Sequence, residues 1–336
     1  MLGSAAGPIR CLSVALAVAL LTATGPSARA TADERIRGIL DTDANNELDD
    51  QHAIAYLLFN SHVFAVEGIT VNRTRAGGGI ERHLAEAARV VELCGMSGRF
   101  PLRRGASGSF EQIRGALGRP GFDGQDAVDF ILERARAQDA RPLALLPIGK
   151  LTNIALALAK DPGIASNIRV VWLGSNYPEP GEYNQTNDEP ALSYILETAV
   201  AFEIVTVRYG KPSGTDAVRA SLDDVRRLLP GKGPRISPPV EGRHGGTFAT
   251  FGDYSVSLFE HIDLHGDPPS RALFDMAAGA IVKNPAWATP VTLPAPKLDR
   301  GTWTDRPTNP RRIVVWENFD RAAIMRDFYD SVANPR

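Results

Sequence analysis

The sequence predicts an α/β fold built on an open, mostly parallel sheet with helices on both faces. The 336 residues are 43% hydrophobic and 23% charged, as in globular proteins that bury a large core. Short β-branched or aliphatic runs alternate along the chain with stretches whose apolar residues recur at helical spacing. Some runs, such as residues 143–146, are wholly apolar, as in strands covered on both faces.

The expected elements follow one another from residue 36 onward. The β-branched and aliphatic runs predict strands at residues 36–40, 64–71, 143–146, 168–173, 203–207 and 313–316. Helical spacing predicts helices at residues 49–59, 80–93, 127–135, 152–159, 190–198 and 271–282, and from residue 320. Residues 229–247 are rich in Pro, Gly and Arg, which indicates a long surface loop that could act as a lid. Without an internal repeat, residues 31–336 are expected to form one domain.

The first 30 residues carry the pattern of a signal peptide. Arg10 is followed by an uncharged apolar run, residues 11–23, that is too short to span a bilayer. The small residues Ala28 and Ala30 then suit a signal peptidase. We therefore expect residues 1–30 to be cleaved and the protein to be secreted or periplasmic, without a membrane contact afterwards. An uncleaved membrane anchor is the alternative.

Charge and cysteine content exclude several partners and bonds. The net charge of −2 offers no basic surface for nucleic acid or anionic lipid, so neither is an expected partner. Cys11 lies in the leader, which leaves Cys94 as the single cysteine of the mature chain and excludes an internal disulfide. Cys94 lies in an apolar stretch and is expected to be buried.

Acidic residues crowd into residues 41–50, Asp-Thr-Asp-Ala-Asn-Asn-Glu-Leu-Asp-Asp, between the first strand and the first helix. In an open parallel sheet this position is the carboxyl edge, where ligands bind. Carboxylates packed so closely need a cation or solvent to screen them, and all-oxygen ligation favours Ca²⁺ or Mg²⁺. A purely structural role at a helix N-terminus would account for Asp49 and Asp50 but not for the acids before them.

Two other acidic motifs share features with this segment. An EF-hand loop is excluded, because its sixth position is Asn46 instead of Gly and its twelfth is His52 instead of Glu. The Asp-x-Asp of Asp41 and Asp43 after a first strand also resembles haloacid-dehalogenase-type phosphatases, in which the first Asp attacks phosphorus. The residues downstream do not fit that family, so a phosphatase is the third-ranked interpretation.

Further polar residues follow other predicted strands. Asn72 follows the strand at 64–71, Thr152 follows the strand at 143–146, and Asn176 follows the strand at 168–173. Because parallel strands end at the same edge of a sheet, these residues should meet the acidic turn there. The sequence therefore predicts a ligand site at this edge.

Five groups of residues also occur in one order along the chain. They are Asp41-Thr42-Asp43 with Leu48-Asp49-Asp50, Gly68-Ile69-Thr70-Val71-Asn72, Gly149-Lys150-Leu151-Thr152-Asn153-Ile154-Ala155, Gly174-Ser175-Asn176 with Glu182-Tyr183-Asn184, and Phe274-Asp275. In this order they resemble the inosine-uridine-preferring nucleoside hydrolases, although the acidic turn is two residues longer here. The resemblance implies a Rossmann-like core.

The resemblance also implies an activity and a division of labour. The activity is Ca²⁺-dependent hydrolysis of the N-glycosidic bond of ribonucleosides or a related N-riboside. The expected partner is this small-molecule substrate, and whether the chain forms a homo-oligomer is left open. Asp43 would be the general base that activates water, and Asp41 would orient its neighbours. The implied Ca²⁺ ligands are Asp43, Asp50, Asp275 and the backbone carbonyl of Thr152. The implied substrate-binding residues are Asp49, Asn72, Asn176, Glu182 and Asn184.

The chain departs from the family at Phe274, where many members carry a histidine that protonates the departing base. Phenylalanine has no proton to donate. The candidate replacements as leaving-group acid are His244, Tyr254, His261 and His265, and the aromatic residues that could stack on a base are Tyr183, Phe248 and Phe251. The alternative function is a non-catalytic extracytoplasmic nucleoside- or sugar-binding protein on the same fold.

Overall fold

The computed structural model describes residues 1–3 and 33–336 of the chain. The chain divides into two units, Met1–Glu34 and Arg35–Arg336, and the fold below is that of the second. The predicted leader lies outside the described residues, apart from residues 1–3, and its cleavage stays a prediction. Among the helices of the described residues, none has the length and apolar character needed to cross a membrane.

The second unit is built on an eight-stranded sheet with the order β11-β14-β6-β5-β4-β1-β2-β3. Every neighbouring pair is parallel except β11 and β14, which confirms the predicted mostly parallel sheet. The strands are β1 (Ile36–Thr42), β2 (Phe64–Val71), β3 (Leu102–Arg104), β4 (Leu143–Pro147), β5 (Ile168–Leu173), β6 (Ala201–Val205), β11 (Thr289–Pro294) and β14 (Arg312–Glu317). The chain proceeds outward from β1 in one direction and from β4 in the other, so the gap between these two strands is the switch point where such sheets bind ligands.

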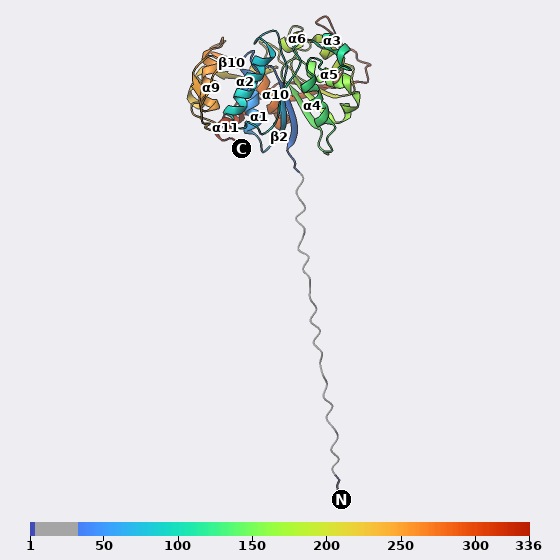
Figure 1. Ribbon diagram of the computed structural model, residues 1–336, viewed down its shortest axis with the longest axis vertical. Helices are drawn as coiled ribbons and strands as arrows, with labels where there is room; N and C mark the ends of the chain where they lie inside the picture. Colours follow the sequence, from blue (N-terminus) through green and yellow to red (C-terminus); the bar gives the residue numbers. More distant parts are fainter. Residues whose placement is uncertain (4–32) are drawn as a thin grey trace. The chain divides into compact units, whose positions relative to one another are not determined.

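Helices cover both faces of the sheet. The helices are α1 (Asp49–Phe59), α2 (Ile80–Leu93), α3 (Phe110–Ile113), α4 (Gln125–Ala135), α5 (Thr152–Lys160), α6 (Tyr183–Asn187), α7 (Glu189–Leu196), α8 (Leu222–Leu228), α9 (Phe251–Glu260), α10 (Phe274–Lys283) and α11 (Arg321–Ala333). Short 3-10 helices lie at Arg114–Ala116, Pro162–Ser166, Thr215–Ala217 and Pro285–Trp287. One hydrophobic cluster joins the sheet to helices α1, α2, α9, α10 and α11. A second cluster joins it to α4, α5 and α7. Figure 1 shows the two groups of helices on opposite sides of the sheet.

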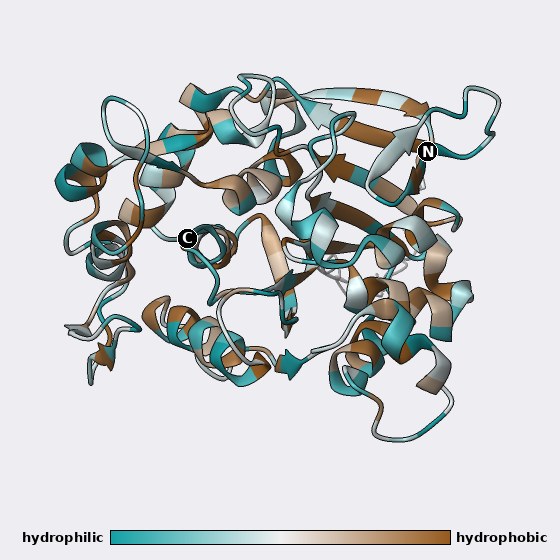
Figure 2. Cartoon of the chain, turned by 90° about the horizontal axis from the view of Figure 1, so that it is seen from above, coloured by the Kyte–Doolittle hydropathy of each residue, from teal (hydrophilic) through white to brown (hydrophobic). Residues whose placement is uncertain are grey.

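Strand β4 shows why the apolar runs predicted a covered sheet. Leu143 and Leu145 belong to the core cluster of one face, whereas Ala144 and Leu146 belong to that of the other. Successive side chains of a strand point to opposite faces, so a strand with helices on both sides needs apolar residues throughout. Figure 2 shows the strands of the sheet coloured mainly as hydrophobic. Cys94, after α2, is buried as expected.

The structure contains several elements that the sequence did not predict, namely edge strands β3 and β11, helices α3, α6, α8 and α9, and three short strand pairs. Edge strand β3 was not expected, because three residues carry no recognisable period. Three small antiparallel pairs were also missed: β7 (Arg219–Ser221) with β10 (Ser270–Ala272), β8 (Val240–Glu241) with β9 (Thr247–Phe248), and β12 (Lys297–Asp299) with β13 (Thr302–Thr304). The helix expected to begin at residue 271 begins at Phe274, because β10 occupies the residues before it. Residues 229–247, expected to form a long loop, are mostly irregular apart from β8 and the start of β9, and the Arg89 guanidinium donates to the carbonyl of Glu241 at 2.6 Å.

Candidate active site

The polar residues expected at the sheet edge do follow the carboxyl ends of their strands. The acidic turn joins β1 to α1, Asn72 follows β2, and Thr152 begins α5 after β4. Ile148 donates its backbone N–H to the carbonyl of Asp41 at 2.8 Å, which ties the end of β4 to the end of β1. These segments therefore meet at the switch point between the two strands.

Asp275 reaches the same place because α10 packs closely on α1. A Cβ at Gly279 would lie 2.7 Å from Leu57 Cδ1 and 3.3 Å from Tyr56 Cδ1, so the absence of a side chain there favours the close approach of the two helices. Asp49 and Asp50 begin α1, and Asp275 is the second residue of α10. The close helix packing therefore brings the acidic ends of both helices together.

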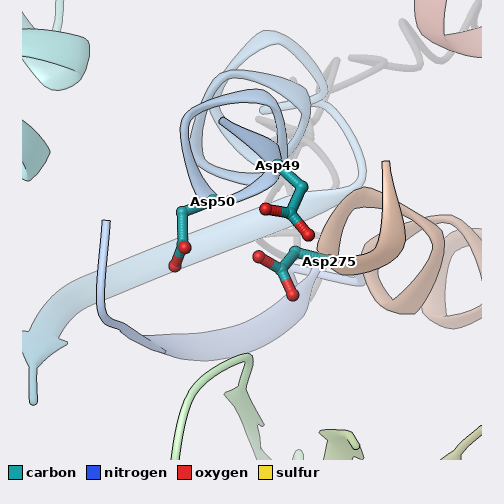
Figure 3. Close-up of side chains that lie close together, drawn as sticks. All are labelled: Asp49, Asp50 and Asp275. Carbon is teal, nitrogen blue, oxygen red and sulfur yellow. The ribbon is translucent and has the colours of Figure 1, made fainter. Parts of the chain in front are cut away.

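Three carboxylates form a compact group at this point. One oxygen from each of Asp49, Asp50 and Asp275 lies within 4.8 Å of the others, and all three residues are buried. Figure 3 shows Asp49 and Asp275 facing each other, with Asp50 beside them. Burial raises the pKa of all three carboxyls well above the ordinary value, and the neighbouring carboxylates raise it further. Such a group is stable as anions only when a cation compensates it.

Asp43 lies beside this group and has one oxygen held and one free. Its Oδ2 accepts hydrogen bonds from Asn46 Nδ2 at 2.7 Å and from the Thr74 hydroxyl. Its Oδ1 is buried and has no protein partner. Burial raises the pKa of Asp43 to about 7, and the charges of Asp49 and Asp41 act in the same direction. Asp43 is therefore positioned by the protein through one oxygen, while its other oxygen is left without a protein partner.

Asp50 has the same one-sided arrangement. Its Oδ1 accepts from the Thr42 hydroxyl and from the backbone N–H of Asp43 at 3.1 Å, whereas its Oδ2 is buried without a protein partner. Burying a carboxylate oxygen without a partner costs free energy. Hard divalent cations bind preferentially to oxygen atoms and could serve as that partner. Because the group offers carboxylate oxygens and neither an imidazole nor a thiolate, its donor set fits Ca²⁺ or Mg²⁺.

Thr152 and Asp41 surround the carboxylate group in different ways. The Thr152 hydroxyl donates to Asp188, so its side chain is occupied and the ligand role expected of its carbonyl stays a prediction. Asp41 accepts hydrogen bonds from the Thr70 hydroxyl at 2.6 Å, from Asn153 at 2.7 Å and from Asn72 at 3.0 Å. Burial raises the pKa of Asp41 to about 6. Asp41 thus fixes the amide of Asn72, whose own Oδ1 is buried and unpartnered.

Gly149 leaves the space that the free oxygen of Asp43 needs. An added Cβ would lie 2.6 Å from Asp43 Oδ1 and 2.9 Å from Asn72 Nδ2, so we expect Gly149→Ala to lower stability by about 1–3 kcal/mol and to weaken calcium binding. Thermal unfolding and calcium titration measure both effects. Gly79→Ala is the matched control, because a Cβ there meets no atom within 4 Å. Equal calcium affinity in the two variants would contradict this account.

A cavity of about 290 Å³ opens next to the carboxylates. Its wall contains Asp49 and Asp275 together with Glu182, Tyr183 and Asn184. Glu182 accepts the backbone N–H groups of residues 175, 184 and 185 at 2.8–2.9 Å, and burial raises its pKa. Asn184 donates its amide to the carbonyl of Ile148 at 2.9 Å. These side chains are held rigidly by backbone groups and present polar atoms to a ligand.

Asn176 is placed differently from the expected sugar contacts. It is buried, but it does not line the cavity. Its Oδ1 accepts the backbone N–H of Tyr209 at 3.2 Å, and its amide donates to the carbonyl of Pro180 at 3.3 Å. Tyr209 itself lines the cavity, so Asn176 supports the wall from behind.

Only one of the four candidate leaving-group acids lines the cavity, and that residue is His265. His244 and His261 stack on each other with ring centroids 4.8 Å apart, and neither belongs to the wall. The hydroxyl of Tyr254 is buried and donates to Glu86 at 2.5 Å. Of the aromatic candidates, Tyr183 lines the cavity, Phe251 is buried beside His52 and Phe59, and Phe248 packs on Tyr254.

The sequence reasoning missed several residues of the cavity wall. Tyr209 packs edge-on against Phe274 with ring centroids 5.8 Å apart, and both line the cavity. Arg219 and Arg271 line it as well, from the small strand pair β7 and β10. The only signal for Arg271 was its position shortly before Phe274, since neither short strand could be recognised from the sequence.

Comparisons with known proteins agree with this arrangement. The family described as inosine-uridine preferring nucleoside hydrolase matches residues 38–324. The non-specific ribonucleoside hydrolase RihC of Klebsiella pneumoniae is 26% identical over 292 residues, which cover 80% of this chain and 86% of that protein. RihC of Salmonella paratyphi A is 30% identical over 184 residues, covering 48% and 58%.

Two solved structures share the fold at low sequence identity. The plant nucleoside hydrolase PpNRh1 has a TM-score of 0.68 and 18% identity, covering 89% of this chain and 99% of that one. The purine-preferring ribonucleoside hydrolase from Gardnerella vaginalis has a TM-score of 0.67 and 21% identity, covering 88% and 98%. The open α/β architecture is therefore common to all three proteins.

Proposed function

The chain belongs to the inosine-uridine preferring nucleoside hydrolase family and is a hydrolase of ribonucleoside N-glycosidic bonds, and from this we propose that Asp43 activates the attacking water and that the site holds Ca²⁺. The observation that carries the proposal is the group of buried carboxylates beside a cavity lined by polar side chains and by the aromatic rings of Tyr183, Tyr209 and Phe274. Two of their oxygens, on Asp43 and Asp50, are buried without a protein partner.

The carboxylates would hold the cation through Asp50, Asp275 and Asp43, with the carbonyl of Thr152 as the further ligand. Asp49 belongs to the same compact group as Asp50 and Asp275, so it would contribute to the cation site as well as to the sugar contact. A bound Ca²⁺ would supply charge neutralisation and Lewis acidity. A family relationship alone does not identify the ion, and the proposal rests on the all-oxygen donor set.

Asp43 would remove the proton of the attacking water. Thr74 and Asn46 hold its Oδ2, which leaves Oδ1 without a protein partner as the basic atom. The water oxygen bonds to C1′ of the ribose, its proton moves to Asp43, and the electron pair of the C1′–N bond leaves with the base. Proton removal by a positioned carboxylate contributes about 10²–10⁴-fold to such a reaction.

The sugar would be held by the polar wall of the cavity. Glu182 and Asn184 present side chains fixed by backbone groups, so they can bind hydroxyls without first being ordered. Asn72 does not line the cavity; it lies near the free oxygen of Asp43 and would bind from the side of β2. Residues 1–30 would direct the enzyme out of the cytoplasm.

Assays of the purified protein on several ribonucleosides and on 4-nitrophenyl riboside, with and without a chelator, test this function. We expect ribose to be released in the presence of calcium and not after chelation. Hydrolysis that is fully retained in the chelator would contradict the metal proposal. Ribonucleoside binding without any turnover would favour the alternative function, a non-catalytic binding protein. The specific observation in favour of that alternative is Phe274, which stands where a proton donor is expected.

A further inference from the structure

Arg271 places a cation at the cavity wall, close in sequence to Phe274. Its side chain is 15% exposed, and its Nη2 forms an ion pair with Glu47 of the acidic turn. Its Nε is buried and has no protein partner. A guanidinium carries five N–H donors. In Arg271, which lines the cavity, the Nε donor is buried and has no acceptor.

Nε2 of the neighbouring histidine is not arranged to donate a proton. Arg271 Nη1 lies 3.3 Å from Nε2 of His265, and a guanidinium can only donate in such a contact. Nε2 of His265 is therefore the acceptor and carries no proton to give to a substrate. Arg271 is thus the hydrogen-bond donor in this contact, and Nε2 of His265 is its acceptor.

The second arginine of the cavity wall is already committed to the protein. Arg219 forms an ion pair with Asp216 at 2.6 Å, and its remaining nitrogens donate to the hydroxyl and carbonyl of Ser270 at 3.0 and 3.1 Å. The buried donor without an acceptor on this side of the cavity belongs to Arg271.

We propose that Arg271 stabilises the negative charge of the departing base, in place of protonation by a histidine. This inference rests on the proposed function. When the C1′–N bond breaks, its electron pair passes to the base, and the charge spreads to any ring carbonyl oxygen. The guanidinium binds that anion without transferring a proton, and the base takes its proton from water after it leaves. Arginine suits this role because it stays charged at every working pH.

The substrate class follows from this chemistry. Oxopurines and pyrimidine-diones, as in inosine and uridine, carry a carbonyl oxygen that accepts from a guanidinium. Adenine has no carbonyl oxygen and offers a guanidinium only ring nitrogens as acceptors. We therefore expect ribosides of carbonyl-bearing bases to be hydrolysed faster than adenosine, because the negative charge of their departing anions concentrates on the carbonyl oxygen that the guanidinium binds.

The test compares Arg271→Gln and Arg271→Lys on leaving groups of different quality. We expect Arg271→Gln to lose about 10²–10³-fold in kcat on inosine and uridine, as when one oxyanion donor is removed, but less than about tenfold on 4-nitrophenyl riboside. Nitrophenolate departs as a stable anion and needs little help. Arg271→Lys keeps the charge and should recover part of the loss on inosine.

Arg226→Gln is the matched control, because Arg226 forms an exposed ion pair with Glu260 and does not line the cavity. Thermal unfolding of each variant verifies that it is folded. An equal loss of kcat by Arg271→Gln on all leaving groups would overturn the inference and leave the proposed function standing. A loss of kcat on inosine that occurs only in His265→Ala would do the same. A wild-type protein that hydrolyses none of the ribosides would overturn both.

Discussion

Asp43→Asn is expected to lower kcat on the best ribonucleoside by about 10²–10⁴-fold while the protein stays folded. The amide keeps the size of the carboxylate and an oxygen that can accept from Thr74, but it cannot take a proton from water. The Oδ1 atom loses its basicity at the position where the protein leaves it free. Steady-state kinetics with inosine or uridine, together with a thermal melt, measure the two parts of this expectation.

The matched control is Asp129→Asn, an acid-to-amide change on the exposed face of α4, where Asp129 pairs with Lys160. It should leave kcat unchanged. Turnover by Asp43→Asn close to the wild-type rate would show that another carboxylate acts as the base, and Asp41 and Asp49 would then be tested in the same way. Asp50→Ala is expected to reduce the amount of bound calcium first.

Removal of calcium is expected to abolish turnover and to lower the unfolding temperature. A cation bound only by the folded chain at about 100 times its dissociation constant contributes about 2.7 kcal/mol, which corresponds to a shift on the order of 5 °C for a chain of this size. Elemental analysis and differential scanning calorimetry measure the occupancy and the shift. Zinc in the purified protein, or no metal after calcium supplementation, would contradict the assignment of the ion.

The calcium-free protein should also respond to pH in a defined direction. Burial raises the pKa of Asp41 to about 6 and of Asp43 to about 7, against 3.8 ordinarily. Between pH 4 and 7 the folded chain therefore binds more protons than the unfolded chain, and its free energy of unfolding falls as the pH rises. Unfolding temperatures of the calcium-free protein across this range should decline, and saturating calcium should reduce the decline. A rise in stability over the same window would contradict the assigned burial.

The sequence by itself determined the sheet and the position of the acidic turn. Both are local properties: the wholly apolar run of β4 requires cover on two faces, and the acidic residues directly follow β1 and begin α1. The carboxyl ends of parallel strands share one edge, so Asp43, Asn72 and Thr152 could be assigned to one side of the sheet without coordinates. Resemblance to a family then added Asp275 and the roles of the carboxylates.

The tertiary structure alone decided which of these groups meet and which stay apart. Asp275 joins Asp49 and Asp50 because Gly279 lets α10 approach α1, a packing relation that no local period encodes. His265 reaches the cavity while His244 and His261 stack away from its wall, although all three lie in the same polar part of the chain. The ion pair of Arg271 with Glu47 joins distant segments through a strand of only three residues. Such contacts depend on how whole elements pack, and the sequence pattern of a single element does not contain that information.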